Sequence, residues 1–103
     1  MVTVGMYYEV LPGKAALFRA KFQEVLALLR ATPGHTRSDL YQRVEDPDSY
    51  AILSEWASRE AFLDFVRSDL FRQVTTWGRE QVLRGAPRHT IYPDAEELGR
   101  GPR

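Results

Sequence analysis

Hydrophobic residues recur along the chain with two different periods, and the change of period marks the expected elements. Over residues 2–10, VTVGMYYEV, β-branched and aromatic residues alternate roughly by two, which predicts a β-strand. From residue 14 to residue 31 the apolar positions recur at helical spacing, which predicts an amphipathic helix with one face to bury. Pro33-Gly34 follows and should end that helix.

The second half of the chain predicts a hairpin, two consecutive helices and a last strand. Pro47-Asp48 provides the hairpin turn, and Ser58 and Ser68 are well placed to cap the N-termini of the two helices. The expected elements are strands over 35–45, 50–57 and 88–93, with helices beginning after the two serines and the second helix reaching about residue 83.

The order β-α-β-β-α-β predicts an α+β fold, the ferredoxin-like sandwich, in which an antiparallel sheet carries its helices on one face. By strand parity Met6 and Tyr8 share one face of the first strand, and His35 shares a face of the second strand with Arg37 and Asp39. The face away from the helices needs cover, and packing against a second copy would supply it. We therefore expect one domain over residues 1–93, a tail over 94–103, and a homodimer through the open sheet face. Aromatic and apolar residues expected in the sheet that could serve such packing are Tyr7, Tyr41, Leu53 and Tyr92.

Composition removes several classes of function. With a formal net charge of zero there is no global field for nucleic acid or an anionic membrane. The apolar runs are too short to span a bilayer, and the N-terminal stretch lacks a basic region followed by a continuous hydrophobic one. We expect a cytoplasmic protein without nucleic-acid or membrane partners.

Site chemistry is limited by the absence of cysteine and by a total of two histidines, His35 and His89. Thiolate nucleophiles, thiolate metal sites and a His-rich metal site are therefore not expected, while a carboxylate-rich site stays open. The scattered glycines form no phosphate-binding loop, so nothing supports a nucleotide or flavin cofactor. The expected cofactor is none.

A longer pattern resembles the antibiotic biosynthesis monooxygenase superfamily. The pattern joins Pro12-Gly13, the bend Pro33-Gly34-His35, the turn 45–48 and the run ILSEWASREAFLDFVRSDLF, and the likeness covers residues 2–93. The resemblance implies a dimeric α+β barrel made of two ferredoxin-like protomers. The superfamily includes cofactor-independent monooxygenases of polyphenols and quinols, haem-degrading monooxygenases and proteins without known activity, so the fold alone does not decide the function.

The haem-degrading branch of that superfamily uses an Asn on the first strand, a Trp on the first short helix and a His on the next helix. Carried onto this sequence, the three positions are Met6, Phe65 and Thr75, so none of the three residues is kept. A threonine cannot replace imidazole as the ligand of haem iron. The resemblance therefore disfavours haem degradation of the known type.

Cofactor-free oxygenation requires a dry pocket, a base and groups that steady a substrate anion. His35 is the candidate general base, with a surface histidine at a strand end as the alternative. Other residues between the sheet and the helices line a pocket for a small aromatic ligand or simply fill the core, and the sequence leaves both open. Those residues are Met6, Tyr8, Trp56, Phe65, Phe71, Thr75 and Trp77. The two hypotheses are a monooxygenase of a small quinol or polyphenol and a non-catalytic dimeric binding protein.

Overall fold

The predicted order of elements is confirmed in the computed structural model, which describes residues 1–92. The predicted tail over 94–103 and the end of the last predicted strand, Pro93, lie outside the described residues. The elements are β1 (Val2–Glu9), α1 (Ala15–Leu29), β2 (His35–Gln42), β3 (Ser49–Trp56), α2 (Arg59–Val66), α3 (Asp69–Gln81) and β4 (Arg88–Tyr92).

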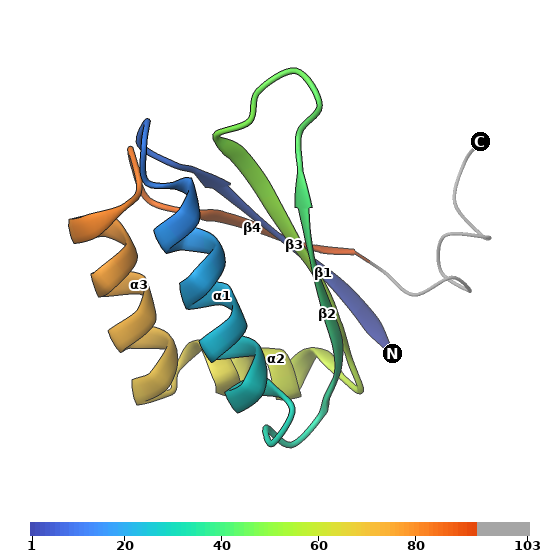
Figure 1. The fold of residues 1–103 in the computed structure, drawn as a ribbon. Coiled ribbons are helices and arrows are strands. Elements are labelled where there is room, and N and C mark those ends of the chain that lie inside the picture. Colours follow the sequence, from blue (N-terminus) through green and yellow to red (C-terminus); the bar gives the residue numbers. More distant parts are fainter. Residues whose placement is uncertain (93–103) are drawn as a thin grey trace, which may run out of the picture.

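The four strands form one antiparallel sheet in the order β2-β3-β1-β4, and all three helices lie on the same face of it (Figure 1). In β1 the buried residues Val4 and Met6 face the helices, opposite Ser54 and Ile52 of β3. This is the alternation that strand parity predicts for β1. The α+β, ferredoxin-like fold class is therefore confirmed.

One parity prediction is wrong, and it concerns the candidate base. β2 is irregular between His35 and Arg37, because His35 is paired with Trp56 while Arg37 is paired with the adjacent Glu55. Such a bulge sets two residues of one strand against one of its partner and reverses the alternation beyond it. His35 therefore shares the helix-covered face with Trp56, 5.1 Å between ring centroids, instead of sharing a face with Arg37.

The strand predicted over 35–45 ends earlier, at Gln42. The backbone N–H of Asp48 donates to the carboxylate of Asp46 at 3.0 Å, which forms a local turn before β3 begins. Val44 consequently leaves the sheet and is 97% exposed.

Both predicted helix caps are present. The Ser58 hydroxyl accepts a hydrogen bond from the Ala61 N–H, and the Ser68 hydroxyl accepts one from the Phe71 N–H, each at 3.1 Å. Ser68 also donates to the carbonyl of Phe65 at 2.6 Å, so one side chain links the end of α2 to the start of α3. The break between the two helices is thus fixed by short-range hydrogen bonds.

The core consists of two clusters of buried side chains. We call the first the Trp56 cluster; it lies between α2 and one end of the sheet, and comprises Val4, Met6, Leu29, Trp56, Phe62 and Phe65. We call the second the Val10 cluster; it lies toward the other end, and comprises Val10, Phe18, Tyr50, Val82 and Leu83. Tyr8 packs against both clusters.

The opposite face of the sheet is not covered by any element within residues 1–92 (Figure 1). Tyr41 and Leu53 on this face are 49% and 36% exposed. The hydroxyls of Tyr7 and Tyr92 lie 2.6 Å apart in a hydrogen bond between β1 and β4. Among the helices of the described chain, none is both long and apolar enough to cross a membrane.

Gly34 provides a test of how β2 is joined to α2. Its φ of +84° is unfavourable for other residues, and a Cβ at Gly34 would collide with the Cβ of Ala61 in α2. We expect Gly34→Ala to lower the free energy of unfolding by about 3 kcal/mol, from backbone strain and overpacking together. Chemical denaturation of the purified protein measures this change.

Gly13 is the matched control, since its φ is +82° and no atom lies within 4 Å of where its Cβ would be. Gly13→Ala should cost only the backbone strain, about 1 kcal/mol. Equal losses in the two variants would show that the approach of Gly34 to Ala61 does not constrain the fold.

Candidate functional site

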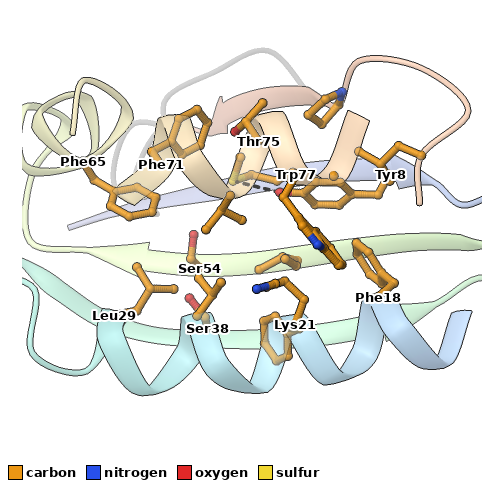
Figure 2. A pocket seen from close by; sticks show the side chains of 18 of the residues that line it. Tyr8, Phe18, Lys21, Leu29, Ser38, Ser54, Phe65, Phe71, Thr75 and Trp77 are labelled. Carbon is orange, nitrogen blue, oxygen red and sulfur yellow. Dashed lines mark hydrogen bonds between the residues drawn. The ribbon is translucent and has the colours of Figure 1, made fainter. Parts of the chain in front are cut away.

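A cavity of about 80 Å³ lies between the sheet and the helices, with α1 on one side and α3 on the other (Figure 2). Residues of both core clusters line it, so the cavity borders the Trp56 cluster and the Val10 cluster. Its walls are largely aromatic and aliphatic. For scale, an engineered cavity of roughly 150 Å³ in another protein accepts benzene, so a ring compound requires some widening of this space.

The structure brings the predicted pocket residues together around this cavity. They come from four elements: Met6 and Tyr8 from β1, Trp56 from β3, Phe65 from α2, and Phe71, Thr75 and Trp77 from α3. Phe71 and Thr75 of α3 are among the lining side chains labelled in Figure 2. The space predicted to be either pocket or filled core is therefore a small cavity inside the core.

Two buried serines form the polar part of the cavity floor. Ser38 and Ser54 are directly paired across β2 and β3, and they are 7% and 4% exposed. Ser54 Oγ accepts a hydrogen bond from Trp56 Nε1 at 3.0 Å, and Ser38 Oγ lies 2.7 Å from His35 Nε2. Figure 2 shows both hydroxyls between α1 and α3.

Sequence reasoning missed these serines, although a signal was present. Ser54 alternates with Ile52 and Trp56 on β3, so strand parity alone places its hydroxyl among apolar side chains. Burying a hydroxyl costs free energy unless it forms a hydrogen bond. A serine in that pattern is therefore a candidate for a group that hydrogen-bonds to a side chain or to a ligand.

His35 does not line the cavity and lies behind Ser38. It packs edge-on against Trp56. Desolvation by burial lowers the pKa of His35 below its ordinary value, and a hydrogen bond to the Leu29 backbone opposes that shift. The imidazole is therefore biased toward its neutral form, which is the form that can accept a proton.

Tyr8 closes the cavity from the β1 side. Its hydroxyl donates to the sulfur of Met6 at 3.7 Å, and burial strongly raises the pKa of the phenol. Tyr8 is therefore a neutral hydrogen-bond donor at ordinary pH rather than a phenolate base.

A lysine that sequence reasoning did not single out connects the two helices that border the cavity. Lys21 Nζ of α1 lies 4.8 Å from the centroid of the Trp77 ring of α3, and it also pairs with Glu24 at 2.8 Å. Both Lys21 and Trp77 line the cavity and are partly exposed, so this cation–π contact lies at its solvent side (Figure 2). Among the described lining residues, Lys21 is the one with a charged side chain.

The sequence matches the model of a known protein family. The sequence model described as "Antibiotic biosynthesis monooxygenase" matches residues 1–77. The chain belongs to the antibiotic biosynthesis monooxygenase family. The match extends from β1 into α3 and thus includes most of the residues that line the cavity.

A relative of this chain is described as a heme-binding protein and not as a monooxygenase. A Halobacterium salinarum protein named "Putative heme-binding protein" is 42% identical over 89 residues, which are 86% of this chain and 18% of that protein. The chain therefore spans about a fifth of the length of that relative. The name describes the longer protein and does not say which part of it binds heme.

Solved structures share the fold at lower identity. A conserved protein from Methanosarcina mazei has a TM-score of 0.82 at 22% identity, covering 90% of this chain and 91% of that one. SnoaB, a cofactor-independent oxygenase from Streptomyces nogalater, has a TM-score of 0.77 at 22% identity, covering 90% and 91%. At this identity the likeness establishes the fold.

The residues around the cavity do not fit a haem. Protein ligands of haem iron are His, Cys, Met or Tyr, and among residues 1–92 the lining offers Met6 and Tyr8, which are hydrogen-bonded to each other. Burial of Tyr8 also disfavours the phenolate that would bind iron. His35 lies behind Ser38, while His89 lies on β4 with its ring 5.8 Å from that of Phe62, and neither lines the cavity.

Proposed function

We propose that this protein is a cofactor-independent monooxygenase that acts on a small aromatic hydroxyl compound, a quinol or polyphenol. One observation carries the proposal. The cavity is largely apolar and aromatic and carries two adjacent buried hydroxyls, Ser38 and Ser54, on its floor; Nε2 of a histidine biased toward its neutral form lies 2.7 Å from Ser38 Oγ. Membership of the monooxygenase family and the shared fold of an oxygenase support the same function.

The chemistry requires no cofactor because the substrate itself supplies the electrons. A base removes one proton from an electron-rich phenol, and the anion adds dioxygen at a ring or benzylic carbon to form a peroxide. The peroxide regains the proton. Where that carbon carries a second hydrogen, loss of water leaves a carbonyl, so the two oxygen atoms end in product and water. His35 is the proposed base for the first proton.

The apolar walls of the cavity and Lys21 would also assist this reaction. Apolar walls exclude water, which strengthens hydrogen bonds to the developing anion. The Lys21 ammonium at the solvent side would attract an anionic oxygen of the substrate. Because a ring compound needs more room than 80 Å³, the Lys21–Trp77 contact is the place where we expect the cavity to widen.

The same cavity would also suit a dimeric protein that binds an aromatic ligand without catalysis, which is the second candidate function. The two candidates share the pocket and differ in turnover. Consumption of oxygen in the presence of a bound ligand distinguishes them.

Oxygen uptake with a panel of quinols and anthrones is the decisive test of the enzyme. We expect at least one compound to be oxidised by the purified protein without added metal, flavin or nicotinamide. Thr75→Phe should lower the rate more than tenfold, because the larger ring occupies the cavity that Thr75 lines. An oxygen electrode and product analysis measure both effects.

Thr76→Phe is the matched control, since Thr76 is the next residue of α3, is exposed, and is not among the lining residues. It should leave the rate unchanged. If no compound in the panel raises oxygen uptake above buffer while several bind, the non-catalytic function replaces the enzyme.

A haemin titration tests whether the heme-binding name of the longer relatives extends to this chain. Because the described part of the lining contains no His or Cys, and its Met6 and Tyr8 are hydrogen-bonded to each other, we expect no stoichiometric shift of the Soret band and no bilin on adding a reductant. A saturable 1:1 shift that Thr75→Phe abolishes would place haem in the cavity and overturn the expectation.

We further propose that two copies pair through the open sheet face. Tyr41, Leu53 and Tyr92 are large hydrophobic residues on that face, and each is at least one-third exposed. Pairing of two such faces would complete the barrel that the family resemblance implies and would remove these side chains from water.

Sedimentation of a Leu53→Asp variant tests the dimer. Leu53 lies on the central strand β3, so a carboxylate there would be buried without a partner on pairing, and we expect a monomer at micromolar concentration. Leu28→Asp on α1, where Leu28 is 50% exposed, is the control and should remain dimeric. A monomeric wild-type protein under the same conditions would rule the dimer out.

A further inference from the structure

Ser38 separates the candidate base from the cavity. His35 does not line the cavity, whereas Ser38 does, and Ser38 Oγ is 2.7 Å from His35 Nε2. A ligand in the cavity therefore meets the serine hydroxyl first. Ser38 therefore connects such a ligand to His35 through one hydrogen bond.

The tautomer of His35 decides the direction of the hydrogen bond between the two residues. A neutral imidazole acts as a base through its unprotonated nitrogen, and Nε2 is the nitrogen that faces Ser38. In the tautomer that carries its proton on Nδ1, the Ser38 hydroxyl donates to Nε2 and leaves its oxygen lone pairs for an O–H in the cavity. The proton path described below requires this tautomer.

Ser54 has the opposite hydrogen-bonding role to Ser38. The indole N–H of Trp56 can only donate, so the bond at 3.0 Å occupies a lone pair of Ser54 Oγ. The hydroxyl proton of Ser54 remains available to a ligand oxygen. Because Ser38 and Ser54 are paired across the strands, an acceptor and a donor stand side by side on the cavity floor.

We propose that Ser38 is the catalytic residue that takes the proton from the substrate hydroxyl while passing its own proton to His35, and that Ser54 donates to a neighbouring oxygen of the same substrate. The inference rests on the proposed function and narrows its substrate to aromatic compounds with two adjacent oxygens, such as a catechol or a hydroxyl beside a carbonyl.

The proton transfer balances within the site. The substrate O–H bond breaks as a new O–H bond forms on Ser38, and the former Ser38 proton forms an N–H bond on His35. The site then holds a substrate anion, a neutral serine and an imidazolium. After dioxygen has added to the substrate anion, the same path in reverse protonates the peroxide and restores the neutral histidine.

Few other ionisable groups bear on this path. Tyr8 and Lys21 are the ionisable side chains that line the cavity in the described chain; Tyr8 is held neutral by burial, and Lys21 lies at the solvent side, over Trp77 and beside Glu24. Around the ring itself lie Leu29, Trp56 and Ser38, none of them charged. The protonation of His35 should therefore report on the ligand that Ser38 contacts.

NMR titration of His35 in the full chain, with and without 4-nitrocatechol, tests the relay without requiring turnover. In the wild type we expect the bound catecholate to raise the midpoint of His35 by about one pH unit, since an adjacent anion favours the imidazolium. Ser38→Ala should reduce the shift to a few tenths of a unit. Ser38→Thr, which keeps the hydroxyl, should restore it.

Ser54→Ala is the matched control, because it removes an equally buried hydroxyl from the same floor without breaking the link to His35. It should weaken binding of 4-nitrocatechol while preserving the His35 shift. If a substrate turns over, Ser38→Ala should lower kcat about 100-fold or more with little change in KM, as expected for loss of general-base catalysis.

Two results would overturn the relay, and they can be told apart. If 4-nitrocatechol binds and the His35 midpoint does not move in the wild type, or moves equally in Ser38→Ala, the relay is wrong while the proposed oxygenase stands. If neither 4-nitrocatechol nor any quinol binds, the relay and the proposed function fail together.

Discussion

The position of one buried indole organises this protein. Trp56 is 1% exposed at the end of β3, where its ring meets Phe62 and Phe65 of α2 at 5.6 and 5.4 Å. The same ring packs against His35, and its N–H is satisfied by Ser54. One side chain therefore joins the sheet to α2, sets the place of the candidate base and fixes the polarity of a hydroxyl in the cavity. A smaller residue would leave a void and release all three constraints at once.

Much of the fold could be predicted because its signals are local. The alternation in β1, the glycine-containing turns and the capping serines Ser58 and Ser68 act over a few residues, and the structure contains each of them. The site depended on less local features. A bulge between His35 and Arg37 brought the histidine to the helix-covered face, and nothing in its own stretch of sequence announced that bulge. Ser38 and Ser54 became a pair only through the register of β2 on β3.

The polar groups of the site are few, and each has a partner. In the described part of the chain every buried side-chain nitrogen or oxygen has a hydrogen-bond partner. Ser38 and Ser54 each have a hydrogen-bond partner within the protein, and each keeps further hydrogen-bonding capacity for a ligand in the cavity. In the proposed reaction these groups would be in place before a substrate binds, so little reorganisation would accompany the transfer of charge.

The division of the core into two clusters has a thermodynamic consequence. Side chains that face the cavity lack contacts on one side, and dispersion attraction is lost there. An aromatic ligand would supply those contacts and become a removable piece of the hydrophobic core. Occupancy and folding are then coupled, because a ligand that binds only the native state adds RT ln(1 + [L]/Kd) to its stability. The stability of the folded protein would thus rise with the concentration of any compound that fills the cavity.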